Sequence, residues 1–281
     1  MIKYNTVIDS VALHIYCNDK KQQHGIMQQL RGWIVSTRIV KIEFDDEIKK
    51  YRLLRGYTTL ATLTQSASHS NFYIRIRFAG LKSYKEKQDI ASYNLLVSIA
   101  AFLNTTKYPY RLAELDIALD CFYPFENMLA ICNTKKANIV YSPLGYVQYY
   151  KGVPTSYIEQ YSHIQQIKNA VSRAYLYDKN SKEKLHCNII TRFELKLQNR
   201  YFLKNNFDVA SIMNAMNNYT VLYFDNILIK ERVIHEYNLH KSLRRVLPRN
   251  RLHMDSKVVS TFLKTIKTAY VNFYGEIIVP K

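Results

Sequence analysis

Apolar and polar residues alternate along several short stretches of the chain, which is the pattern of β-strands with one face in a core. The clearest case is residues 71–78, where phenylalanines and isoleucines alternate with Tyr73, Arg75 and Arg77. Residues 141–161 are rich in tyrosine and contain glycines and prolines that favour turns between strands. The pattern therefore predicts strands at 7–16, 38–44, 51–64, 71–78, 111–122, 172–179 and 189–197, with further strands inside 141–161.

Other segments repeat apolar residues at helical spacing. They predict helices at 20–35, 83–104, 125–132, 208–217, 225–247 and 256–270. The last of these carries an apolar stripe of Val258, Val259, Phe262, Leu263 and Ile266. We therefore expect an α+β protein in which helices cover the hydrophobic side of a sheet. Residues 1–200 would form the sheet-based domain, and residues 201–281 a helical, basic C-terminal region packed on it or appended to it.

The stretch at 111–122 is the most informative one for chemistry. Its odd positions are apolar, whereas its even positions include Glu114, Asp116 and Asp120. Successive side chains of a strand point to opposite faces, so three carboxylates share one face. Like charges this close repel one another unless a cation lies among them, and hard divalent cations prefer oxygen ligands. The pattern fits a metal site, and it also fits a solvated face paired with lysines and arginines.

The charge balance favours a polyanionic partner. Lys and Arg total 40 against 22 Asp and Glu, which gives a net charge of +18. Nucleic acid fits better than a membrane, because no basic amphipathic anchor is apparent and the longest apolar run, 95–103, is too short to span a bilayer. The polar N-terminus predicts a cytoplasmic protein. The four cysteines lie far apart without a Cys-x-x-Cys pair, which argues against zinc knuckles and disulfide frameworks.

Basic side chains are candidate contacts for a DNA backbone. Two lie on the strand at 71–78, one on the strand at 189–197, and the others in the basic segment 241–251, although a solvated surface explains each of them as well. They are Arg75, Arg77, Arg192, Lys241, Arg244, Arg245, Arg249 and Arg251. The alternation also predicts that Arg192, Glu194 and Lys196 face away from the core.

Three sequence blocks together resemble the rolling-circle replication initiators. They are Arg-Leu-x-Glu-Leu-Asp-Ile-Ala-Leu-Asp at 111–120, Arg-x-Tyr-x-Tyr-Asp-Lys at 173–179 and Thr-Arg-Phe-Glu-Leu-Lys-Leu at 191–197. The resemblance is to the branch of small Gram-positive plasmids, filamentous phages and some conjugative-element relaxases, which generally lacks a His-x-His motif, as this chain does. It covers roughly residues 108–200.

The resemblance implies an antiparallel sheet flanked by helices, a fold related to the His-hydrophobic-His nucleases, and a nicking and joining reaction on one DNA strand. A tyrosine of such proteins becomes linked to the 5′ phosphate, with Mg²⁺ or Mn²⁺ held by carboxylates. By this likeness Tyr177 is the nucleophile, and Tyr175 is its first substitute. Arg173 and Lys179 would steady the phosphate. The metal ligands would be Asp116 and Glu194, supported by Glu114 or Asp120. The implied partners are an origin DNA with a single-stranded or cruciform nick site, and a host helicase and polymerase; many members of the family act as homodimers.

Alternatives remain open at this stage. The Gly-Ser-Arg-x-Ser element that often precedes the tyrosine block is reduced here to a Ser-Arg pair at 172–173, so Tyr157 and Tyr161 are further candidate nucleophiles. The same fold with a decayed site would be an origin-binding regulator without catalysis. A mobilisation relaxase would use the same chemistry.

Overall fold

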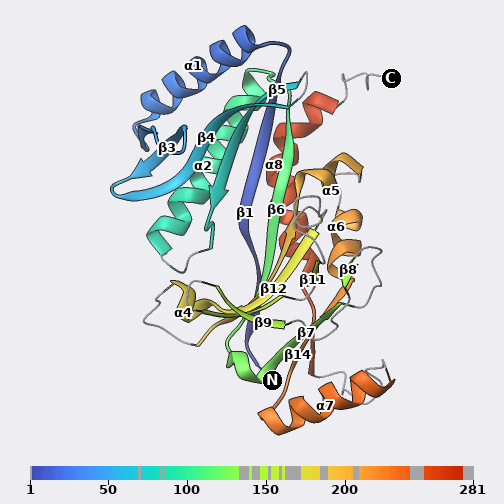
Figure 1. Cartoon of the computed structure of the whole chain (residues 1–281). Coiled ribbons are helices and arrows are strands. Elements are labelled where there is room, and N and C mark those ends of the chain that lie inside the picture. The colour runs from blue at the N-terminus through green and yellow to red at the C-terminus, as the bar shows by residue number, and fades with distance from the viewer. Residues whose placement is uncertain are drawn as a thin grey trace. The chain divides into compact units, whose positions relative to one another are not determined.

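A computed structural model describes most of the chain (Figure 1). The described residues are 2–68, 71–82, 84, 86–132, 139–140, 146–150, 153–157, 160–161, 172–183, 189–204, 209–240 and 250–274. They belong to two compact units, each described below by itself. The N-terminal unit comprises Ile8–Leu115 with Val259–Lys281, and the central unit comprises Met1–Val7 with Asp116–Val258. Strands β1 (Tyr4–Cys17) and β6 (Tyr110–Cys121) contribute residues to both units.

The N-terminal unit is an antiparallel sheet covered by helices. Its strands hydrogen-bond in the order β2-β3-β4-β5-β1-β6, and the β2–β3, β3–β4, β4–β5 and β1–β5 pairs are antiparallel. Helix α1 packs against β5 and β2, and helix α2 packs against β4. The further elements are β2 (Lys41–Asp45), β3 (Lys50–Arg55), β4 (Thr58–Ser68), β5 (Asn71–Ala79), α1 (Lys20–Thr37) and α2 (Glu86–Thr105).

The predicted alternation of β5 is confirmed. Ile74, Ile76 and Phe78 have no solvent exposure, because they pack in the core, while the residues between them are partly exposed. The helices supply the other side of this core through apolar stripes; the buried members are Ile26, Met27, Leu30 and Ile34 of α1 and Leu95, Leu96, Ile99 and Leu103 of α2. Asp19 caps α1 by accepting a 2.7 Å hydrogen bond from the backbone of Gln22.

The central unit places β6 in a second run of strands, in the order β6-β13-β12-β10-β9. The β12–β13, β10–β12 and β9–β10 pairs are antiparallel. The strands of this run are β9 (Tyr146–Tyr150), β10 (Val153–Tyr157), β12 (Ser172–Asp178) and β13 (Thr191–Leu197). The short strands β8 (Ile139–Val140) and β11 (Gln160–Tyr161), which precede β9 and follow β10 in the sequence, pair with each other in a separate two-stranded sheet. Strands within 141–161 are thus confirmed. A short helix, α4 (Lys179–Glu183), follows β12.

A small three-stranded sheet completes the central unit. It joins β7 (Met128–Cys132), β14 (Tyr219–Tyr223) and β15 (Arg251–Leu252) in the order β15-β14-β7. Leu129, Ile131, Leu222 and Phe224 form its core, against which Val233 and Ile234 of helix α7 (Ile227–His240) pack. The prediction of a helix at 125–132 is wrong beyond its first turn. A 3₁₀ turn over Phe125–Asn127 leads directly into β7, which pairs in antiparallel register with β14.

Three C-terminal helices, α6 (Val209–Met216), α7 and α8 (Ser256–Tyr274), lie where helices were expected. Helix α5 (Asn199–Lys204) was not predicted. Val259, Phe262, Leu263 and Ile266 of α8 are buried, which confirms most of its predicted stripe. Within the described part of the chain, no helix has the length and apolar character that a membrane crossing requires. The α+β class, an antiparallel sheet flanked by helices, is confirmed.

Candidate functional site

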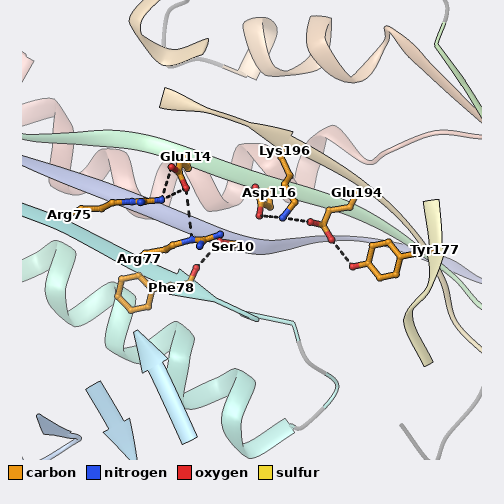
Figure 2. Close-up of polar contacts among 9 residues, drawn as sticks. All are labelled: Ser10, Arg75, Arg77, Phe78, Glu114, Asp116, Tyr177, Glu194 and Lys196. Atoms are coloured by element: carbon orange, nitrogen blue, oxygen red, sulfur yellow. Dashed lines mark hydrogen bonds and ion pairs between the residues drawn. The ribbon is translucent and has the colours of Figure 1, made fainter. Parts of the chain in front are cut away.

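Two adjacent strands of the central unit bring Tyr177 to Glu194. The β12–β13 register sets Tyr175 opposite Glu194 and Tyr177 opposite Arg192. From this diagonal position the Tyr177 hydroxyl donates a 2.6 Å hydrogen bond to Oε2 of Glu194 (Figure 2). Both side chains are at least 97% buried, at 3% and 2% exposure. The hydroxyl of Tyr177 is thus held in a defined direction by a carboxylate.

Lys196 joins the same carboxylate to β6. Its Nζ lies 2.7 Å from Oε1 of Glu194 and 3.1 Å from Oδ2 of Asp116 (Figure 2). Asp116, Tyr177, Glu194 and Lys196 therefore form a continuous polar chain, called here the tyrosine–carboxylate cluster. Two carboxylates of this cluster converge on a single cationic group.

The charges of the cluster stabilise one another in spite of burial. Burial by itself would raise the pKa of Glu194, but the charge and hydrogen bond of Lys196, the hydrogen bond of Tyr177 and the charge of Lys182 lower it to about 2. Burial would likewise lower the pKa of Lys196, but Asp116 and Glu194 raise it well above its usual value. At neutral pH the cluster therefore holds an ionised Glu194 and a protonated Lys196.

A second lysine lies on the ring of Tyr177. The Nζ of Lys182, in α4, is 4.0 Å from the ring centroid, which is cation–π distance. The neighbouring Tyr175 is less buried than Tyr177 and has Lys196 at 5.9 Å from its ring centroid. Burial raises the pKa of Tyr175, and the charge and hydrogen bond of Arg173 and the charge of Lys196 partly oppose this. The sequence analysis assigns no role to Lys182 or Lys196. Lys196 lies two residues after Glu194 on the same strand face, and this spacing could have indicated that the two side chains pair.

Arg192 and Asp120 do not belong to a solvent-facing site. Both side chains have zero exposure, and Arg192 contacts the two carboxylate oxygens of Asp120, with Nη2 at 2.6 Å from Oδ2. Arg192 was expected to face outward and contact DNA. The structure buries it instead, because Asp120 supplies the compensating charge on the same face of the sheet. Both carboxylate oxygens of Asp120 thus accept hydrogen bonds from Arg192.

The remaining predicted ligand, Glu114, belongs to the N-terminal unit. Both of its carboxylate oxygens lie 2.6 Å from Nη2 of Arg75, and Oε2 lies 3.8 Å from Nε of Arg77. Each acid of the β6 face therefore has its own basic partner. Among the described residues, no group of three or more His, Cys, Asp or Glu side chains is arranged to hold a metal ion.

The other candidate residues are scattered. Lys179, at the start of α4, is buried, and its backbone N–H donates to the carbonyl of Ile190 over 2.9 Å. Arg251 lies in β15 and is partly exposed, whereas Lys241, Arg244, Arg245 and Arg249 lie outside the described residues. Backbone pairing sets Tyr157 of β10 opposite Tyr175, and Tyr161 lies in β11.

Comparison with solved structures finds a distant likeness. A rolling-circle replication initiator protein from Geobacillus stearothermophilus aligns with 95% of this chain and 97% of its own, at 9% sequence identity and a TM-score of 0.39. No protein-family model matches the sequence, and the search of curated proteins returned no match. The functional argument therefore rests on the residues of this chain.

Proposed function

We propose that this protein is a DNA-nicking replication initiator in which Tyr177 attacks a phosphodiester at an origin. The observation that carries the proposal is the hydrogen bond from the Tyr177 hydroxyl to an ionised, buried Glu194, with Lys196 on the far side of that carboxylate. A phenol with an ordinary pKa near 10 is a weak nucleophile unless its surroundings activate it. The resemblance of the three sequence blocks to rolling-circle initiators supplies the reaction class.

The reaction would be a phosphoryl exchange without a change of oxidation state. The phenolic oxygen of Tyr177 forms a bond to phosphorus, and the bond from phosphorus to the 3′ oxygen breaks. The phenol proton is lost to water, and the departing 3′ oxygen takes up a proton from water. The products are a 5′-phosphotyrosine link and a free 3′ hydroxyl, from which a polymerase extends.

The side chains of the cluster would have separate roles in this step. Glu194, with a pKa of about 2, binds a proton too weakly to be an effective base, so it would orient the hydroxyl. Lys182 would stabilise the negative charge that develops as the oxygen attacks, and Lys196 keeps Glu194 ionised in the absence of a metal. Tyr177 is 3% exposed, so DNA would have to displace part of its cover, of which Lys182 in α4 is one described member.

A divalent metal fits two of the four predicted ligands. Asp116 and Glu194 already converge on one cation, the ammonium of Lys196, and Mg²⁺ is commonly held by one or two carboxylates and several waters. They would hold Mg²⁺ or Mn²⁺ if Lys196 withdrew. Such an ion would polarise the scissile phosphate. Asp120 and Glu114 fit less well, because arginines engage both of their oxygens.

A second candidate is an origin-binding regulator that does not cut DNA. The burial of Tyr177 and the position of Lys196 between the two carboxylates favour it, because both features restrict access for a phosphate or a metal ion. The strong positive charge suits either function. A mobilisation relaxase would use the same nicking chemistry as the initiator.

A nicking assay separates the initiator from the regulator. Supercoiled plasmid carrying the DNA that flanks the gene is incubated with full-length protein and Mg²⁺ or Mn²⁺. Open-circle product with wild type, lost in Tyr177→Phe and in Asp116→Ala, supports the proposal. Tight binding to the same DNA without any nicking by the wild type would overturn it in favour of the regulator.

A further inference from the structure

The polar face of the N-terminal sheet carries cross-strand rows of basic and hydroxyl side chains, with carboxylates at its β2 edge, where Glu43 and Asp45 lie opposite Arg52 and Lys50 and both pair with Arg52. One row runs through Arg52, Thr62 and Arg77, which are paired in register on β3, β4 and β5. The next runs through Thr64, Arg75 and His14 on β4, β5 and β1. Residues directly opposite one another share a face, so these side chains stand together on the side away from the apolar core.

A groove lies within this face. It has a volume of about 180 Å³. Its polar lining comes from Lys50, Arg75, Arg77 and the threonines Thr59, Thr62 and Thr64. No aspartate or glutamate is among the described residues that line it. Three cations and three hydroxyls without a carboxylate are complementary to an anion with several oxygens, such as a phosphate.

The size of the groove limits what it can hold. Pockets for drug-sized molecules usually measure roughly 300–1,000 Å³, and this groove is smaller. Arg75 and Arg77 are two residues apart on β5, so they are separated by roughly 7 Å along the strand. Such a spacing lets each arginine meet a different charge of a linear polyanion.

The two arginines are already occupied by a carboxylate from outside the groove. Arg75 bonds Glu114 at 2.6 Å, and Arg77 lies 3.8 Å from it. The side chains of this ion pair are 31% exposed for Arg75 and 27% for Glu114, so solvent and ions reach them. The Nε atoms of Arg75 and Arg77 have no hydrogen-bond partner among the described residues. Both guanidiniums therefore retain unused donors.

We infer that this groove binds backbone phosphates of DNA, and that Glu114 is an internal competitor which the phosphates replace on Arg75 and Arg77. The identity of the partner as DNA rests on the proposed function. The groove itself, including Lys50 and the threonines, lies wholly within the N-terminal unit and takes no part in the tyrosine chemistry. Phosphate contacts of this kind position a protein on DNA without reading its sequence.

Salt-dependent binding tests the groove. Full-length protein is titrated with a fluorescein-labelled DNA duplex of unrelated sequence over a range of NaCl concentrations. The slope of log K against log salt concentration is negative, and each lost phosphate contact reduces its magnitude by about 0.9. Lys50→Gln and Arg77→Gln should each lose about this amount and bind several-fold more weakly at low salt. Lys87→Gln, which removes an equal charge from an exposed position of α2, should keep the wild-type slope.

The competitor role makes the opposite prediction for Glu114. Glu114→Gln should bind the same duplex several-fold more tightly than wild type, because Arg75 and Arg77 are released. Equal slopes for Lys50→Gln and Lys87→Gln would overturn the groove, and unchanged affinity of Glu114→Gln would overturn the competition. Nicking is measured on the same preparations to distinguish the groove from the proposed function. A wild type that binds DNA but does not nick it would overturn the proposed nicking function and leave the groove unaffected.

Discussion

The Tyr177 hydroxyl donates its 2.6 Å hydrogen bond to Glu194 across two antiparallel strands, although the residue directly opposite Glu194 is Tyr175. The carboxylate of Glu194 therefore accepts a hydrogen bond from Tyr177, while Tyr175 is its backbone neighbour on the adjacent strand. The contact selects Tyr177 as the oriented hydroxyl, while Tyr175 hydrogen-bonds Arg173. This difference makes Tyr175→Phe a matched control for Tyr177→Phe, since each substitution removes one hydroxyl from the same strand.

The depressed pKa of Glu194 predicts a loss of stability in acid. Its value is about 2 in the folded protein against an ordinary 4.5, because Lys196, Tyr177 and Lys182 outweigh the effect of burial. A lowered carboxyl pKa contributes stability that is complete above pH 4.5 and lost between pH 4.5 and 2. Over that window the free energy of unfolding should fall by roughly 3 kcal/mol more in wild type than in Glu194→Gln.

Urea denaturation at a series of pH values measures this difference. Glu86→Gln is the control, since Glu86 is an exposed residue of α2. Parallel pH profiles for wild type and Glu194→Gln would contradict the ion-pair account of the cluster.

His14 predicts a second pH effect at a less acidic range. It is 5% exposed and stacks on Tyr73 with ring centroids 4.3 Å apart. Burial and the charges of Arg111 and Arg75 lower its pKa from 6.5 to about 3. The folded protein therefore holds a neutral His14, whereas the unfolded chain takes up a proton below pH 6.5, so stability falls as the pH falls from 6.5 toward 3.

His14→Gln should remove this component of the pH dependence. Between pH 6.5 and 4.5 the wild type should lose up to about 1.4 kcal/mol per pH unit relative to the variant. Substitution of the exposed His24 by Gln should leave the profile of the wild type unchanged. An imidazole of His14 that titrates near pH 6.5 in an NMR experiment would refute the prediction.

The buried pair of Asp120 and Arg192 predicts a large cost for breaking it and a smaller one for removing it. Asp120→Leu removes the carboxylate that contacts the guanidinium of Arg192, a group of zero exposure, which should cost about 3–5 kcal/mol of unfolding free energy. The double variant Asp120→Leu with Arg192→Met should recover much of that loss, because the buried guanidinium is removed together with the carboxylate. Chemical denaturation of the two variants tests this, and a double variant less stable than the single one speaks against it.

Much of the fold followed from the alternation of residues, but the chemistry of the strand faces did not. The β5 pattern predicts its core face, since Ile74, Ile76 and Phe78 pack under helices whose stripes are also visible in the sequence. The β13 pattern failed for Arg192, because alternation equates a charged residue with solvent. A charge can be buried when the neighbouring strand supplies its counter-ion, and Asp120 does so from β6. Strand pairing is not readable from one chain's periodicity.

The type of the shortest elements also could not be predicted from the sequence pattern. Strand β7 has five residues and was read as part of a helix, because apolar runs of this length have no distinctive period. Its strand form depends on the pairing with β14, which lies about ninety residues later. By contrast, the resemblance of the sequence blocks assigned Tyr177 and Glu194 to one site, and a hydrogen bond joins them in the structure. The bridge by Lys196 was not predicted, because side-chain reach is a property of the folded structure.

The bridge by Lys196 predicts competition with metal ions. If Asp116 and Glu194 bind Mg²⁺ or Mn²⁺, removing the lysine ammonium should strengthen binding, because the same carboxylates hold Lys196 at 3.1 and 2.7 Å. Metal should therefore raise the Tm of Lys196→Gln by more than that of wild type at equal concentration. Asp116→Asn should abolish the metal-induced rise. An equal response of all three proteins would argue against a metal site at these carboxylates.

The central claim is that the oxygen of Tyr177 becomes bonded to DNA, and mapping the covalent link tests it most directly. Full-length protein is allowed to react with the flanking-DNA plasmid and Mn²⁺, nuclease trims the DNA, and trypsin releases the peptide of residues 174–179, which holds both Tyr175 and Tyr177. Fragmentation in the mass spectrometer should place the phosphonucleotide on Tyr177, and Tyr175→Phe should keep the adduct while Tyr177→Phe loses it. An adduct on Tyr175 or any other tyrosine, or its persistence in Tyr177→Phe, would contradict the account.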